Sequence, residues 1–272
     1  RGWLVLEMTD SPFLVTAANA ITLLPPSLAA PFTGVMADRL NRRMVLIVGE
    51  VATFVTLLIL ALLALNDSLQ VWHIFALSTL TGIAFALIMP TRPAAVPNLV
   101  TPQDLANAMA LYTSLVSGSL FVGPAIAGYM IDTWNIGLTF LTASLLLIPA
   151  VALLFMLRLP TAIGALGNAP SGSVLSNLSE GLEYVVRRPV LIGILLIAIV
   201  TATFGTPYMT LLPVIARDIL RVGPDGLGML GAATGIGMLM GAFTAACFSK
   251  SGQLKLLLLL GGIGIGPILM LF

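Results

Sequence analysis

The chain has 272 residues, of which 58% are hydrophobic and only 8% are charged, and its formal net charge at pH 7 is +1. Soluble domains carry about 25% charged residues, so this composition excludes an ordinary soluble protein and indicates a chain that crosses a membrane several times. The single cysteine, Cys247, excludes an intramolecular disulfide, and no Cys-x-x-Cys or histidine-rich tract offers a metal site.

The predicted elements are membrane-spanning helices, each of which needs about 20 mainly apolar residues to cross the hydrocarbon core. Nine segments meet or approach this length: residues 1–8, 12–37, 44–65, 71–90, 105–131, 136–157, 190–215, 227–248 and 254–272. The first is a stub, and Pro25-Pro26 predicts a kink in the second. The proline-rich stretch from Pro90 to Pro102 predicts that the fourth helix ends near Pro90.

Lys and Arg alternate between the predicted loops, which predicts the orientation of the helices. One set of loops holds Arg39, Arg42, Arg43, Arg92, Arg158, Arg187, Arg188, Lys250 and Lys255, whereas the other holds Arg217 and Arg221. Short loops rich in Lys and Arg face the cytoplasm. We therefore expect the first set to be cytoplasmic and the first predicted helix to end at the outer surface.

A long polar connection, residues 159–189, separates the sixth and seventh predicted helices. Its first part is rich in Gly, Ala, Ser and Asn and is typical of a flexible linker. Residues 176–188 have an amphipathic helical pattern with a capping box of Asn177 and Glu180. We expect this helix to lie on the inner membrane surface, either as a tether or as a regulatory element. The expected division is a bundle over 1–158, this linker, and a second bundle over 190–272.

A short charged turn between the second and third predicted helices carries a family resemblance. It resembles the signature loop of the major facilitator superfamily through the pattern Gly34-x-x-x-Asp38-Arg39-x-x-Arg42-Arg43. Asn41 stands where the signature has glycine, and Asn tolerates a left-handed backbone nearly as well, so we expect the turn to be kept.

Four further segments, residues 3–12, 90–94, 98–100 and 104–108, are similar to the drug and siderophore exporter branch of this superfamily, which contains macrolide and enterobactin exporters. The resemblance implies an all-α polytopic membrane protein with two parallel six-helix bundles. The chain would run from the end of span 1 to span 9 of twelve. It starts at Arg1 and stops within an apolar run, so we expect a fragment.

The signature loop is either a conformational latch or only a marker of topology. Asp38 is predicted at the C-terminal end of a helix, where the helix dipole disfavours a carboxylate by about 0.3–1 kcal/mol. It therefore needs a nearby cation or a helix N-terminus, and Arg42 and Arg92 are the local candidates. The resemblance implies docking onto a helix of the other half in the outward-facing state. The predicted latch comprises Gly34, Asp38, Arg39, Arg42, Arg43 and Arg92.

The fifth predicted helix contains a segment, residues 118–128, that resembles the antiporter motif of the family. It departs from the motif at Ser119 and Ala127. Glycines let helices approach closely, and a proline removes one backbone hydrogen bond, so the segment can bend at a packed interface. Its role is either efflux gating or packing, with Gly118, Gly123, Pro124 and Gly128 as the candidate residues. For the glycines at 231, 235, 237 and 241 in the eighth helix we expect packing.

Polar side chains within spans are functional candidates because burying them in hydrocarbon is unfavourable. Glu50 lies about two turns into the third span, placed either to bind a proton or cationic substrate or to form a structural ion pair with Arg39 or Arg42. His73, beside Trp72, is expected at the membrane interface and not in a proton relay. Further candidates to line a cavity are Arg1, Glu7, Asn19, Tyr112 and Tyr208.

The sequence thus predicts a bacterial inner-membrane exporter that moves an amphipathic or apolar small molecule by alternating access. The resemblance implies proton antiport, and no phosphate-binding GxxxxGK[ST] loop is present. The expected partners are the small-molecule substrate, protons and the lipid bilayer; we expect no nucleic acid, no cofactor and a monomer. The alternatives are an importer, a non-transporting scaffold or sensor, and a membrane-embedded enzyme, for which we find no cluster of catalytic residues.

Overall fold

The computed structural model describes residues 1–39, 41–157, 183–184, 186–200, 203 and 207–248. Within these residues it contains helices and no strands. The helices are α1 (Gly2–Thr9), α2 (Pro12–Arg39), α3 (Arg42–Leu65), α4 (Val71–Ala95), η1 (Val96–Asn98), α5 (Leu105–Thr133), α6 (Ile136–Met156), α8 (Pro189–Val200), α9 (Pro207–Val214), η4 (Ile215–Ile219) and α10 (Pro224–Phe248). Five of them are long and apolar enough to cross a membrane, which agrees with the predicted all-α membrane fold.

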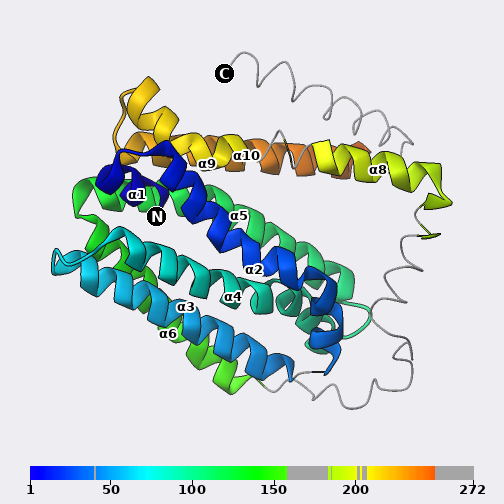
Figure 1. Ribbon diagram of the computed structural model, residues 1–272. Helices are drawn as coiled ribbons and strands as arrows, with labels where there is room; N and C mark the ends of the chain where they lie inside the picture. The colour runs from blue at the N-terminus through cyan, green and yellow to red at the C-terminus, as the bar shows by residue number, and fades with distance from the viewer. Residues whose placement is uncertain (40, 158–182, 185, 201–202, 204–206, 249–272) are drawn as a thin grey trace.

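The long helices run roughly parallel to one another, with α3 and α6 on one side and α8 to α10 on the other (Figure 1). Helix α4 packs against α2 and α3, α3 also packs against α6, and α5 packs chiefly against α10. One buried cluster joins α1 to α2, α3 and α4 through Leu4, Leu6, Val15, Leu60 and Ile74. Many other large apolar side chains lie on the surface, as expected for helices whose outer faces contact lipid.

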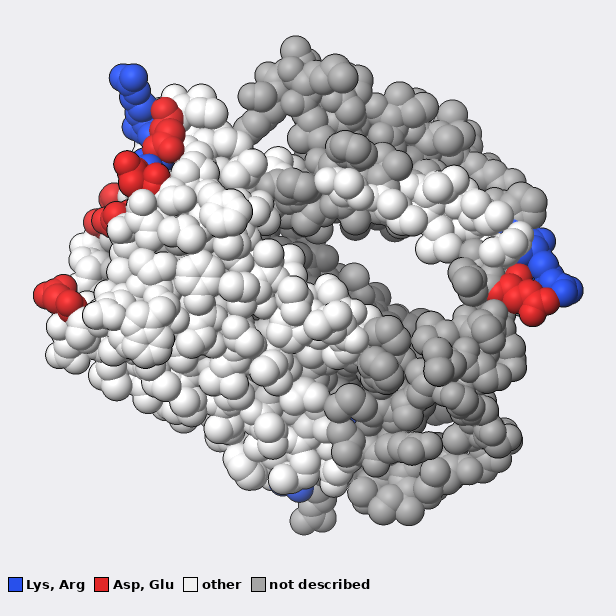
Figure 2. Space-filling view, viewed as in Figure 1, with Lys and Arg blue, Asp and Glu red and all other residues white. Residues whose placement is uncertain are grey.

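Charged side chains gather near opposite ends of the molecule in Figure 2, with an uncharged belt between them. Charged groups at the centre of a bilayer cost about 2.5–3.5 kcal/mol each on insertion scales, so this distribution fits a membrane-spanning orientation. In line with the predicted orientation, we call the end that contains residues 41–43 and 96–98 the inner end. The end with residues 66–70 and 134–135 is the outer end.

Asparagine side chains start two of the long helices. The Asn41 side chain accepts hydrogen bonds from the backbone N–H groups of Arg43 and Met44, and Asn135 accepts one from Leu138 at 2.7 Å. Such caps satisfy N–H groups that lack a partner in the first turn. Asn41 has φ −65° and ψ 104°, so our expectation of a left-handed backbone at this residue was wrong. The residue instead serves as the N-cap of α3.

The prediction that α4 ends near Pro90 was also wrong. The helix continues through Pro90 and Pro93 to Ala95. Membrane helices can contain internal prolines. At the end of this helix the Arg42 guanidinium donates to the Ala94 carbonyl oxygen at 2.7 Å. Helix α2 likewise passes Pro25-Pro26 without a break in its helical assignment.

The seventh predicted span is represented by α8 and α9. The predicted ninth span lies outside the described residues, as does most of the predicted amphipathic helix at 176–188. Where that helix is described, Arg187 pairs with Glu183, and the Arg188 guanidinium lies 4.3 Å from the centre of the Tyr184 ring. The domain boundaries at 158 and 190 remain a prediction.

Candidate functional site

At the inner end, two arginines of the signature loop bind the C-terminal ends of neighbouring helices. Arg42 Nη1 donates to the Ala94 carbonyl oxygen of α4 at 2.7 Å. Arg43 Nε donates to the Leu154 carbonyl oxygen of α6 at 3.1 Å, and its Nη2 donates to that of Phe155. A cation at a helix C-terminus is favoured by the helix dipole. The start of α3 thereby holds α4 and α6 together at this end.

Glu50 is buried between α3 and α4, with 5% of the residue exposed, and forms an ion pair with Arg92. We had expected Arg39 or Arg42 as its partner and had considered Arg92 for Asp38. The side chains of Gly34, Asp38 and Arg39 lie outside the described part of the structure. The observed pair favours the structural alternative for Glu50, because a carboxylate held by a guanidinium is already neutralised.

The antiporter-like segment of α5 crosses α10 at close range. A Cβ atom added to Gly128 would lie 2.5 Å from the Pro224 carbonyl oxygen and 2.8 Å from the Gly228 Cα atom. One added to Gly231 would lie 2.7 Å from the Pro124 Cβ atom. These glycines let the two backbones touch, which is the packing that small residues provide in membrane helices.

The other candidate glycines of these helices are not in such contacts. A Cβ atom added to Gly118, Gly123, Gly237 or Gly241 would meet no described atom within 4 Å. The close contact is therefore made by the outer part of each helix. Sequence reasoning found both glycine series but did not predict that they face each other.

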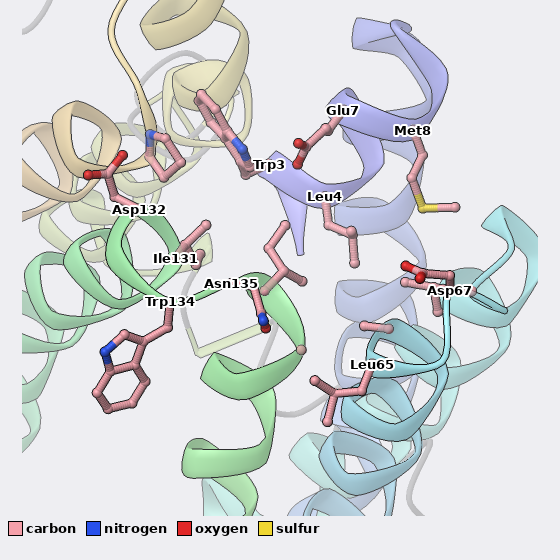
Figure 3. Close-up of a pocket in the computed structure, with 15 residues that line it drawn as sticks. Trp3, Leu4, Glu7, Met8, Leu65, Asp67, Ile131, Asp132, Trp134 and Asn135 are labelled. Carbon is pink, nitrogen blue, oxygen red and sulfur yellow. The ribbon is translucent and has the colours of Figure 1, made fainter.

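A cavity of about 740 Å³ opens at the outer end among α1, α3, α5, α6 and the first residue of α10. Figure 3 shows Leu4 and Glu7 of α1 on one side and Leu65 and Asp67 at the end of α3 and in the turn after it on another. Opposite them lie Ile131, Asp132, Trp134 and Asn135. Its polar and aromatic lining comprises Trp3, Glu7, Asp67, Asp132, Trp134 and Asn135. Of these, only Glu7 was a sequence candidate. Trp3 lies in α1 and Asp132 near the end of α5, and the others lie in or beside the turns that follow α3 and α5.

The remaining cavity candidates are not brought together. Asn19, Tyr112 and Tyr208 are half-buried on α2, α5 and α9, and their side chains make no hydrogen bond within the described part of the chain. His73 Nδ1 accepts a hydrogen bond of 3.0 Å from the Gln70 backbone N–H at the start of α4. It therefore serves as a helix cap at the outer end, in line with the expected interface position.

Sequence reasoning missed a contact between the N-terminal and C-terminal helices at the outer end. Arg217 of η4 pairs with Asp10, the residue that follows α1, and donates to the Leu6 carbonyl oxygen at 3.0 Å. The only indication of this contact in the sequence was that Arg217 and Arg221 lie in the set of loops that holds few basic residues. Among the described residues, no group of three His, Cys, Asp or Glu side chains is arranged to hold a metal ion.

The family of this chain follows from its similarity to known proteins. A family model of the major facilitator superfamily, described as "transmembrane secretion effector", matches residues 1–271. The chain belongs to this family. The predicted superfamily resemblance and the multi-pass membrane fold are therefore confirmed.

The relatives of this chain carry efflux and transport names. Macrolide efflux protein A of Streptococcus pyogenes is 23% identical over 257 residues, which cover 94% of this chain and 63% of that protein. The enterobactin exporter EntS of Shigella boydii serotype 4 is 26% identical over 261 residues, covering 94% and 60%. The MFS-type transporter YfiS of Bacillus subtilis is 24% identical over 239 residues, covering 87% and 56%. The chain thus spans about three fifths of the length of these relatives.

Proposed function

We propose that this member of the family is a secondary active transporter that exports an amphipathic or apolar small molecule by alternating access. The observation that carries the proposal is the family match over residues 1–271, together with relatives named for macrolide efflux and enterobactin export. The same match supports a transporter over an enzyme. The bundles at 1–158 and 190–272 would rock around a central site, with 159–189 connecting them.

The α5–α10 crossing supports this motion. At Gly128 and Gly228 backbone meets backbone without intervening side chains, and Gly231 lies against the ring of Pro124. Two smooth helix surfaces can tilt across each other without breaking a network of interlocked side chains. In this proposal the antiporter-like segment, which contains Pro124, acts as the pivot between two helix groups. These are the helices of residues 1–158 and the helices of residues 190–272.

The expected driving force is proton antiport, and it rests on the family resemblance. The expected cargo is lipophilic because the spans carry few charges. Macrolides and enterobactin, which the relatives' names give, are the first compounds to test. We propose that the protein works as a monomer in the bacterial cytoplasmic membrane.

The test is export from cells that lack their major efflux pumps. The full-length protein is expressed, and the cellular content of a macrolide, enterobactin and a panel of lipophilic dyes is measured with and without a protonophore. We expect lower accumulation of at least one compound, which the protonophore reverses. Gly128→Val, which should block the α5–α10 crossing, is the inactive control at matched expression.

Other outcomes separate the alternatives. Higher accumulation that depends on the proton gradient would indicate an importer. Accumulation unchanged across the panel, with correctly inserted protein, would favour a scaffold or sensor. Export that persists when the proton gradient is collapsed would retain the exporter but contradict proton antiport.

A further inference from the structure

The strongest feature that the proposed function does not use is the contact of Arg217 at the outer end. Arg217 lies in η4, a π-helical turn that follows α9, in which the Leu220 N–H bonds to the Ile215 carbonyl oxygen at 2.9 Å. π-helical turns are rare in proteins. Here the turn carries the arginine side chain to the end of α1.

All three nitrogens of the Arg217 guanidinium are used. Nη1 donates to the Leu6 carbonyl oxygen at 3.0 Å, Nη2 pairs with the Asp10 carboxylate, and Nε donates to Asp218 Oδ1 at 2.7 Å. The hydrogen bond to Asp218, and after it that to Asp10, raises the pKa of Arg217 above its ordinary value. The guanidinium is therefore charged at every physiological pH.

The partner of Arg217 is a helix terminus and not only an exposed carboxylate. Leu6 is fully buried, and its carbonyl oxygen also accepts the Asp10 N–H at 2.9 Å as α1 ends. Asp10 has φ 53°, a left-handed conformation that aspartate tolerates better than most residues. An exposed ion pair alone contributes little, but a guanidinium that also binds the negative end of α1 gains from the helix dipole.

This contact differs in kind from the α5–α10 crossing. The crossing joins backbone to backbone, whereas the Arg217 contact is polar and lies partly in water, with 84% of the Asp10 side chain exposed. Water can replace its hydrogen bonds when it opens. Beside it, a Cβ atom added to Gly2 would lie 3.1 Å from the Pro213 Cγ atom, and Val214 packs against the buried cluster of α1 to α4. Substitution of Arg217 or Asp10 can weaken the polar contact without changing this apolar one.

We propose that Arg217, Asp10 and the Leu6 carbonyl form an outer clasp, which holds the outer ends of the two helix groups together and must open before cargo can leave to the outside. This role rests on the proposed transport function. The clasp itself, however, is a claim about conformation that can be tested without any substrate.

The experiment measures the distance across the outer end in the full-length protein reconstituted in lipid bilayers. Spin labels are attached at Ser68→Cys and Leu220→Cys, both exposed positions, in a Cys247→Ser background, and pulsed electron resonance gives the distance distribution. Arg217→Gln should raise the ratio of long to short distances about tenfold, the effect of 1.4 kcal/mol. Asp10→Asn, which leaves the arginine on the Leu6 carbonyl, should produce a smaller shift in the same direction.

Arg221→Gln is the matched control. Arg221 is an exposed arginine four residues further on, with no hydrogen bond or ion pair to a described residue. It should leave the distribution unchanged. The clasp is refuted if Arg217→Gln and Asp10→Asn both leave the distances as in the parent, or if Arg221→Gln shifts them equally. Should Arg217→Gln fail to fold, Asp10→Asn still decides the question.

The clasp and the proposed transport function fail in different ways. A distance shift in a protein that exports none of the tested compounds would retain the clasp and count against the exporter. Normal export with distances unaffected by Arg217→Gln would retain the exporter and overturn the clasp.

Discussion

At the scale of single residues, Asn41 shows how a departure from a family pattern can preserve local structure by a different route. The sequence alone indicated that asparagine would be tolerated here, but the reason it suggested was the backbone, whereas the side chain is what matters. Asn41 has an extended backbone and caps α3 with its carbonyl oxygen. Glycine, the usual residue in the signature, has no side chain with which to do this.

We predict that Asn41→Ala lowers the stability of the protein by about 1 kcal/mol, because it removes the acceptor for two N–H groups. Asn41→Asp should be close to neutral, and Asn41→Gly should cost only a few tenths of a kcal/mol. The measurement is thermal unfolding in detergent. If Asn41→Asp were as damaging as Asn41→Ala, the capping explanation would be wrong.

Glu50 and Arg92 should respond unequally to mutation. Arg92→Met leaves a buried carboxylate without its cation, and removal of one partner of a buried pair costs roughly 3–5 kcal/mol. Glu50→Gln should cost less, because the Arg92 side chain is 48% exposed and can bind water. The double variant should recover much of the loss of Arg92→Met in a thermal unfolding assay. Additive losses, or a larger loss for Glu50→Gln, would contradict the pairing.

The sequence identified Glu50 as important but could not name its partner. The sequence offered Arg39 and Arg42, whereas the observed partner is Arg92, whose approach depends on which face α4 turns toward α3. That rotation is set by packing, such as the contact of Gly49 with Ile88, where an added Cβ atom would lie 2.4 Å from the isoleucine Cγ1 atom. A single sequence does not contain this information.

At the scale of helices, boundaries were predictable where the chain itself supplies the end and not where a neighbour does. The start of α5 at Leu105 and of α6 at Ile136 matched prediction, and a cap or turn precedes each. The end of α4 did not, because the helix continues through Pro90 and Pro93 to Ala95 and is held at its end by Arg42, more than 50 positions earlier in the chain. Membrane helices tolerate internal proline, so proline alone does not mark their ends.

Helix α4 approaches α2 so closely that Gly82→Ala should destabilise the protein. The added Cβ atom would lie 2.4 Å from the Thr22 carbonyl oxygen and 3.0 Å from the Pro25 ring. The Thr22 carbonyl lacks its usual helical donor because Pro26 has no N–H, and α4 closes against it. We expect a loss of about 1–3 kcal/mol, typical of overpacking.

The control for Gly82→Ala is Gly118→Ala, where the added methyl group meets no described atom within 4 Å. Both variants are compared by thermal unfolding in the same detergent. Equal losses would show that glycine flexibility, and not the α2–α4 contact, determines the effect.

The α5–α10 crossing should likewise tolerate a larger side chain at one glycine and not at another. Gly128→Val must push a side chain against the backbone of Pro224 and Gly228, and neither can move as a flexible side chain would. We therefore expect it to abolish or strongly reduce export and to lower stability by about 1–3 kcal/mol. The measurement is the accumulation assay described above, at matched expression.

Gly123→Val is the control at the same crossing helix, because an added Cβ atom there meets no described atom within 4 Å. It should retain export. A loss of export with Gly123→Val equal to that with Gly128→Val would favour a gating role for the whole glycine series over packing at one crossing.

At the scale of the whole molecule, the structure brings together the turns that the charge analysis assigned to one side of the membrane. The start of α3 contacts the ends of α4 and α6 through Arg42 and Arg43, so three predicted cytoplasmic segments share one end. The α3–α4 turn and the α5–α6 turn line one cavity at the other end. The alternation of Lys and Arg was thus sufficient to sort the turns into two groups, but it leaves the direction of the molecule in the membrane as a prediction.

That direction can be tested with one cysteine at each end. In a Cys247→Ser background, Ser68→Cys lies in the exposed α3–α4 turn and Asn98→Cys in the exposed η1 turn, at opposite ends of α4. A membrane-impermeant maleimide added to intact spheroplasts should label Ser68→Cys at once and Asn98→Cys only after permeabilisation, because the arginine-rich end faces the cytoplasm. The reverse order would turn the outer clasp and the exit path to the cytoplasmic side. Labelling of both from outside would mean that α4 does not cross the membrane at all.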